Sequence, residues 1–288
     1  MTNILQAIAT IINNPRPDLL SYYKSQSNNR INALGDALEY FVKDAFANTI
    51  DEPELSNKEK KYKELFSWSG NQNTFPDFMI RNGDAIEVKK IQSSGGDINL
   101  NSSYPKSKLF SNDPQISSKC RNCETWIEKD IVYAIGVTSA GKTKQTLKRL
   151  WLIYGDCYAA SKEYYERIRV QIATGIKAIH DVEFTTTAEL GKVKKVDPLG
   201  ITHLRIRGMW HINNPAKVFD NINTGYDRQT TFPIIAIMKE NKYSSFPPDS
   251  KTMIESISRP GFNINTQQIK CPDNPVDFIP AKIITYNI

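Results

Sequence analysis

The stretch FPDFMIRNGDAIEVKKI, residues 75–91, decides the fold, because it combines a strand pair with closely spaced acidic and basic residues. The Asn82-Gly83 pair between two apolar runs predicts a β-hairpin with a two-residue loop, since both positions tolerate a positive φ. The second run alternates, so Ile86 and Val88 point to one face of the strand and the residues between and after them to the other. We therefore expect Glu87 and Lys89 side by side on one strand face.

A second carboxylate, Asp77, follows Pro76 at the start of the first run. Two carboxylates can hold a hard cation such as Mg²⁺, and a lysine beside them can orient or deprotonate a water near a phosphate. In an ideal two-residue hairpin, however, Asp77 faces Val88 and points away from the acidic and basic side chains of the second strand. The site then requires a bulge near Phe78, or an Asp77 outside the ladder, which the preceding proline favours. The alternative is a solvated Glu–Lys pair on a strand surface.

A helix is predicted from about Ile31 to Phe46, where apolar residues recur at helical spacing. Glu39 lies on its separate polar stripe, four residues before Lys43. The two could form a surface ion pair. The sharper hypothesis is that Glu39 leans over the strand pair and adds a third carboxylate to the metal site.

Other elements follow from the same patterns. Helices are expected over residues 2–14, over 119–129 and after Ser161, the last with an apolar face of Tyr164, Ile168, Ile172, Ile176 and Ile179. Strands are expected at 130–137, 150–156, 204–212 and 231–239. The last third, which is rich in proline, is predicted to be mostly loops. With no repeat and no clean linker, residues 1–288 are interpreted as one mixed α/β domain.

Composition sets the broad class. The 288 residues carry 40% hydrophobic and 24% charged side chains, which is ordinary for a globular protein, and a net charge of +6, which is compatible with a polyanionic partner. No apolar run is long enough to cross a membrane. The N-terminal residues lack a basic leader with a long apolar core, so the expected location is the cytoplasm.

Several polar segments suit contacts with DNA phosphates or base edges. The loop SSGGDINLNSSYPKSKLF, residues 93–110, supplies the candidates Ser102, Ser103, Lys106 and Lys108. On the strand LRIRGMWHI, residues 204–212, Arg205 and Arg207 share one face and could bind guanine edges or phosphates. An ordinary surface loop and plain surface charges are the alternatives.

Two further motifs carry less weight. Residues 136–143, GVTSAGKT, fit the phosphate-loop pattern, but only seven residues separate them from the next strand, whereas a parallel crossover needs about a dozen. An antiparallel hairpin with a basic tip is therefore expected. Cys120 and Cys123 form C-x-x-C, but no second ligand pair is available for zinc, so reduced thiols on a helix are the interpretation.

Taken together, the chain resembles the PD-(D/E)xK nuclease superfamily and, within it, the NgoPII family of type II restriction endonucleases. Pro76-Asp77 and Glu87-x-Lys89 carry the first resemblance. The second rests on segments in order along the chain: SQSNNR (25–30), GDALEYFVKD (35–44), RNGDAIEVKK (81–90), LNSSYPKSKL (100–109), VDPLGIT (196–202) and RIRGMW (205–210).

The resemblance implies a central mixed sheet flanked by helices, a homodimer, Mg²⁺ and cleavage of double-stranded DNA at the palindrome GGCC to blunt ends. It also implies Asp77 and Glu87 as metal carboxylates, Lys89 as the water-orienting base and Glu39 as a supporting acid. A nuclease core over about 31–180 would be followed by an elaboration over about 181–288 that contributes to DNA recognition. A cognate DNA methyltransferase would act as a partner in the same system, without direct contact.

Three alternatives stay open. A repair or structure-specific nuclease of the same superfamily would differ only in its substrate. A nucleotide hydrolase would use residues 136–143 and depend on Lys142. A DNA-binding protein without catalysis would use Glu87 and Lys89 as a surface pair only.

Overall fold

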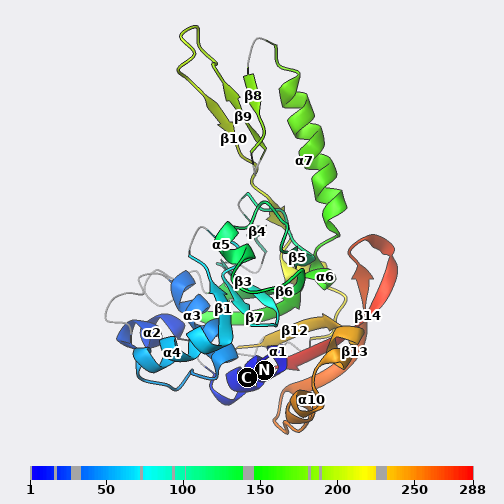
Figure 1. Ribbon diagram of the computed structural model, residues 1–288. Coiled ribbons are helices and arrows are strands. Elements are labelled where there is room, and N and C mark those ends of the chain that lie inside the picture. Colours follow the sequence, from blue (N-terminus) through cyan, green and yellow to red (C-terminus); the bar gives the residue numbers. More distant parts are fainter. Residues whose placement is uncertain are drawn as a thin grey trace.

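The computed structural model describes residues 2–15, 18–26, 34–71, 74–92, 95–100, 102–138, 146–180, 183–187, 190–224 and 232–287. Its centre is a mixed sheet in the order β1-β2-β3-β6-β7-β12-β14-β13, with β5 also paired to β6 (Figure 1). These strands are β1 Phe66–Ser69, β2 Phe78–Ile80, β3 Ala85–Ile91, β5 Lys108–Phe110, β6 Glu128–Thr138, β7 Leu147–Tyr154, β12 Ile234–Lys239, β13 Phe262–Cys271 and β14 Asn274–Tyr286. The expected central mixed sheet flanked by helices is confirmed.

Two parallel pairs, β3–β6 and β7–β12, lie among antiparallel neighbours. Their residues form near-continuous apolar runs, such as IVYAIGV in β6 and IIAIM in β12, because these strands are buried on both faces. The core therefore lies along the middle of the sheet, and the hairpin β2–β3 lies close to one edge.

Helices cover this sheet. They are α1 Ile4–Asn13, α2 Leu19–Gln26, α3 Leu34–Ala47, α4 Leu55–Leu65, α5 Ser118–Arg121, α6 Gly155–Tyr158, α8 Pro215–Val218, α9 Glu240–Ser245 and α10 Pro248–Glu255. The side chain of Asn3 caps α1 by accepting hydrogen bonds from the backbone amides of Leu5 and Gln6. The helix packs against α3 and α10. In turn, α3 packs on β3. No helix within the described ranges combines the length and apolar character needed to cross a lipid bilayer.

The strands β6 and β7 pair antiparallel, as the short spacing after the phosphate-loop pattern predicts. Residues 139–143 of that pattern lie outside the described residues. A phosphate loop would have to open a helix that leads to a parallel strand. The antiparallel β6–β7 pairing is not the parallel crossover that a phosphate loop requires.

Three expectations for secondary structure are wrong. The single strand expected over 204–212 is two short strands in different sheets, over 204–206 and 211–212, so Arg205 and Arg207 do not share one strand. The helix expected over 119–129 is the single turn α5, because β6 already begins at Glu128. The last third contains long strands rather than mostly loops. Pro280 is compatible with β14 because the pairing with β12 ends at Ala281, so the missing N–H breaks no ladder bond on that side. Strands β12, β13 and β14 all come from the segment 181–288 and complete the central sheet.

An arm projects from the body of the molecule (Figure 1). We use this name for α7 Lys162–Lys177 together with the three-stranded sheet of β8 Glu183–Thr185, β9 Gly191–Lys194 and β10 Leu204–Ile206. None of the residues of α7 is buried, although the helix begins where the sequence predicts it. The chain returns from the arm through β11 His211–Ile212, which pairs with β4 Ile98–Asn99 of the body.

Candidate active site

The hairpin β2–β3 has a three-residue loop instead of the expected two-residue loop. The Ile80 amide donates to the Asp84 carbonyl at 2.9 Å, and of the Asn82-Gly83 pair only Asn82 has a positive φ, 55°. Phe78 is therefore opposite Ile86. This register differs by one residue from the predicted one, and a shift of one residue moves every side chain to the other face.

Continuing that register by one residue places Asp77 opposite Glu87. The predicted conflict between Asp77 and the second strand is thus resolved by loop length, without a bulge at Phe78. Asp77 lies just before β2, and its Oδ2 accepts a hydrogen bond of 2.6 Å from the Val88 amide. The Lys89 Nζ lies 2.5 Å from Glu87 Oε1. The three charged side chains of the motif are therefore brought together.

The carboxylates are strongly perturbed by burial. Burial and the nearby Glu87 carboxylate raise the pKa of Asp77 to about 8. Burial also raises the pKa of Glu87, more than the adjacent ammonium lowers it. For Lys89, burial lowers the pKa, but the attraction of Glu87 and Asp77 outweighs it and the pKa lies above its usual value. Lys89 is therefore a cation at neutral pH, and it donates hydrogen bonds.

Glu39 forms the ion pair that the sequence offered as the alternative, whereas no third carboxylate joins Asp77 and Glu87 in a metal-binding group among the described residues. Its Oε1 accepts from Lys43 Nζ at 2.6 Å, as the i, i+4 spacing predicts. The same carboxylate also raises the pKa of Asp77 and of Glu87, so it lies within electrostatic range of both. Glu39 therefore adds negative charge to the site while its own bonded partner is a lysine of the same helix.

The donor set suits a hard cation. Glu87 Oε2 is buried and has no hydrogen-bond partner, which is costly for a carboxylate unless a cation or water satisfies it. Within the described ranges, no three His, Cys, Asp or Glu side chains gather in a metal-binding arrangement. Two carboxylates are nevertheless enough for Mg²⁺, which takes oxygen ligands and retains several waters. Asp77 and Glu87 therefore fit this ion.

A shallow hollow of about 450 Å³ adjoins the site and is lined by Lys89, Lys90, Gln92 and residues 96–99. Sequence reasoning missed Lys90 and Gln92 as candidate site residues. Their position directly after the acidic-x-basic triplet was the available signal. Ile98 and Asn99 of β4 also line this hollow, and the pairing of β4 with β11 could not be predicted because each strand has only two residues.

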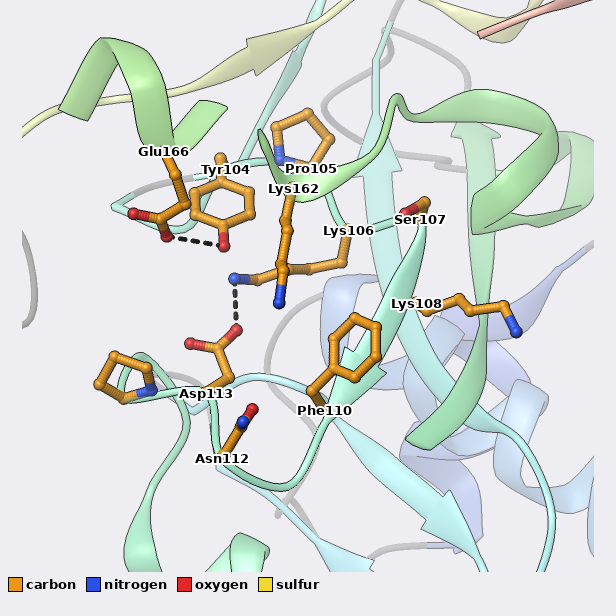
Figure 2. A pocket seen from close by; sticks show the side chains of 11 residues that line it. Tyr104, Pro105, Lys106, Ser107, Lys108, Phe110, Asn112, Asp113, Lys162 and Glu166 are labelled. Carbon is orange, nitrogen blue, oxygen red and sulfur yellow. Dashed lines mark hydrogen bonds and ion pairs between the residues drawn. The ribbon is translucent and has the colours of Figure 1, made fainter. Parts of the chain in front are cut away.

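Lys106 lies in a pocket of its own (Figure 2). Its ammonium is 2.5 Å from Asp113 Oδ2 and 3.6 Å from the centre of the Tyr104 ring, and the side chain is almost fully buried. Burial lowers its pKa despite the Asp113 carboxylate. In this arrangement the ammonium faces the protein interior, whereas Lys108 is partly exposed and bonds to Glu128.

The remaining DNA-contact candidates are spread over the surface. Ser102 and Ser103 are half-buried in a turn, and the Ser102 carbonyl accepts a 3.4 Å hydrogen bond from the Gln115 side chain. Arg205 and Arg207 are exposed on the arm, one within β10 and one just after it. The structure thus brings the acidic and basic motif together, whereas these candidates lie in a turn and on the arm.

The central sheet flanked by helices defines a mixed α/β protein, and two carboxylates and a lysine meet on one of its strand pairs. A sequence model of the NgoPII restriction endonuclease family matches residues 2–270, and the chain belongs to this family. The Type II restriction enzyme NgoPII of Neisseria gonorrhoeae is 43% identical over 288 residues, which cover 99% of this chain and 100% of that protein. No solved structure matches. The family predicted from the sequence is confirmed.

Proposed function

We propose that this type II restriction endonuclease uses Mg²⁺ to hydrolyse phosphodiester bonds of double-stranded DNA at a short palindrome, GGCC, leaving blunt ends. One observation carries the proposal: Asp77, Glu87 and Lys89 meet at a buried centre in which one Glu87 oxygen has no partner. This meeting of the three side chains supports the PD-(D/E)xK assignment that the sequence predicts. The GGCC target comes only from the family resemblance.

In the proposed reaction, a water attacks the scissile phosphate in line with the leaving oxygen. Asp77 and Glu87 would hold the ion through their carboxylates, and a bound Mg²⁺ would supply Lewis-acid chemistry. Lys89, a cation at neutral pH, donates hydrogen bonds that orient the water and offset charge developing on the phosphate. Glu39 keeps the local potential negative and so favours a cation at the site.

A homodimer is part of the proposal. Each chain supplies one such centre, whereas a double-strand cut at a palindrome needs two centres related by two-fold symmetry. The cognate DNA methyltransferase would protect the host DNA without touching this protein. A cytoplasmic location, where both enzymes meet the same DNA, completes the proposal.

For DNA contacts we retain the candidates that solvent reaches: Ser102, Ser103, Lys108, Arg205 and Arg207. Lys106 would first have to leave Asp113, so its proposed role as a DNA contact needs a rearrangement on binding. A nucleotide hydrolase is disfavoured by the antiparallel β6–β7 pair. A repair nuclease of the same superfamily would share the centre and differ only in substrate.

The test is incubation of the purified protein with a plasmid of known sequence, with Mg²⁺ and with EDTA. We expect discrete fragments with Mg²⁺ alone, ending in the middle of GGCC. Discrete fragments with ends outside GGCC would support Mg²⁺-dependent cleavage but would reject GGCC as the target sequence. The control is Asp77→Ala, which should bind the plasmid and leave it intact. Cleavage by that variant at the wild-type rate would reject the assignment of the centre.

A further inference from the structure

The small sheet of the arm has two chemically different faces. The register pairs Val193 with both Phe184 and Leu204, which makes a row of apolar side chains. The next row, on the other face, pairs Lys192 with Arg205. Lys194 belongs to this second face too, since alternate residues of a strand share a face. The arm therefore presents a basic face on one side.

The basic face brings two cationic side chains together. Lys192 and Arg205 are direct partners on neighbouring antiparallel strands. A phosphate between the two side chains would be attracted by both. Lys194, two residues along, bonds to the exposed Glu183 at 3.1 Å. Such an exposed pair is weak and can be exchanged for a phosphate.

The tip of the arm, residues 195–202, is an ordered turn held by side-chain hydrogen bonds. The Asp197 side chain accepts hydrogen bonds from the amides of Ile201 and Thr202, at 2.9 and 3.1 Å, and Gly200 adopts a φ of 69°. This turn exposes Leu199 by 81% and Ile201 by 72%. An ordered turn that exposes two large apolar side chains to solvent is typical of a surface that binds a partner molecule.

The root of the arm adjoins the catalytic centre. Strand β11 follows β10 and pairs with β4. Ile98 and Asn99 of β4 line the same hollow as Lys89. A polyanion that reaches Lys89 therefore passes the root of the arm. The helix α7, with 16 residues, is about 24 Å long, which gives the arm the reach to extend along a duplex.

We propose that the arm binds the DNA duplex beside the cleavage site. Its basic face, through Lys192, Lys194 and Arg205, contacts phosphates without reading sequence. Its tip, through Leu199 and Ile201, packs its apolar side chains in a groove, as apolar wedges do in other DNA-bending proteins. This inference rests on the proposed function, since it takes DNA as the substrate. A second copy of the chain suits the same surface less well, because two identical basic faces repel each other.

The basic face is tested with the double variant Lys192→Gln/Arg205→Gln in the full-length protein. Binding to a duplex of about 40 base pairs containing one GGCC is measured by fluorescence anisotropy in EDTA, over about 50 to 200 mM salt. Loss of two phosphate contacts should make the slope of log K against log salt shallower by about 1.8 and raise the Kd about tenfold or more. The matched control is Lys60→Gln/Lys63→Gln on the exposed side of α4. An effect no larger than that of the control would overturn the role of the face.

The tip is tested with Leu199→Ser/Ile201→Ser, which removes exposed side chains and should leave the thermal unfolding midpoint unchanged. We expect the Kd for the same duplex to rise about 5- to 10-fold with an unchanged salt slope, because the lost contacts are apolar. Light scattering should give the wild-type mass. A wild-type Kd, or a fall in mass that shows the tip docking on a second copy, would overturn the proposed groove contact.

The outcomes separate this inference from the proposed function. If the wild-type protein cleaves DNA and both arm variants bind like wild type, the arm inference fails and the nuclease stands. If the wild-type protein never cleaves with Mg²⁺ but the arm variants bind DNA more weakly, the arm inference stands and the catalytic proposal fails.

Discussion

Helices α1 and α7 both have an apolar stripe at helical spacing, yet they have opposite environments. In α1 the isoleucines at 4, 8, 11 and 12 are buried against α3 and α10. In α7 no residue is buried, and Ile168 and Ile172 are exposed by 39% and 40%. An apolar stripe thus predicts that a helix forms, but tertiary neighbours decide whether the stripe is covered.

The same contrast extends to the body and the arm as wholes. The body holds the proposed catalytic centre, in which burial raises the pKa of the Asp77 and Glu87 carboxyls. The arm presents its charges and its tip to solvent. We therefore expect substitutions in the body to change chemistry and folding, and substitutions in the arm to change binding. The three predictions below test this division.

The largest effect is expected for Glu87→Gln. It removes the buried one of the two proposed metal carboxylates, so the charge that would hold the ion is halved, and cleavage of plasmid DNA should fall about 10³-fold or more. DNA binding in EDTA should change little, since the arm is intact. Cleavage rates and anisotropy titrations measure the two effects. Cleavage within a few-fold of wild type would place the chemistry outside this hairpin.

A matched pair of isoleucine substitutions should separate the two helices. Ile8→Ala in α1 leaves a cavity at a fully buried position and should lower the free energy of unfolding by about 2–5 kcal/mol. Ile172→Ala in α7 should change it by about 0.5 kcal/mol or less, since alanine also favours helix. Urea unfolding followed by circular dichroism measures both. Equal losses would mean that the α7 stripe is covered in solution.

The smallest expected effect concerns pH. Because the pKa of Asp77 is raised from 3.8 to about 8 in the folded state, the folded state binds more protons between these values. The metal-free protein should therefore lose stability as pH rises from about 4 to about 8. Asp77→Asn removes this loss, so near pH 8 the metal-free variant should be more stable than wild type by about 1–3 kcal/mol.

Added Mg²⁺ provides the control for the pH prediction. It should stabilise the wild-type protein, by mass action on the folded state, and should have little effect on Asp77→Asn. Thermal unfolding midpoints across this pH range, with and without Mg²⁺, measure both results. A pH profile of the variant that is parallel to wild type would contradict the assignment of Asp77 as the perturbed group.

Much of the body was predictable, because its signals are local. The apolar periodicity gave α1, α3, β6 and β12 close to their observed bounds, and the motif placed Asp77, Glu87 and Lys89 in one hairpin. The register was not predictable, because Asn82-Gly83 also fits a loop one residue shorter. Strands β8 and β9 of the arm were missed, since each has only three or four residues, too few for alternation to stand out. Strand β14 was not predicted because its prolines indicate a loop. A strand tolerates proline where the neighbouring strand has already ended, and the sequence does not show where that is.

The length of the loop at residues 81–83 sets the register of strand β2 against strand β3 at the proposed site. Side chains alternate along a strand, so the number of loop residues sets whether Asp77 meets Glu87 or points away from it. Gain or loss of two residues preserves that parity. Gain or loss of one forces a choice between a bulged loop and a separated pair of carboxylates. Over evolutionary time, the length of this turn is therefore expected to change by even numbers of residues only.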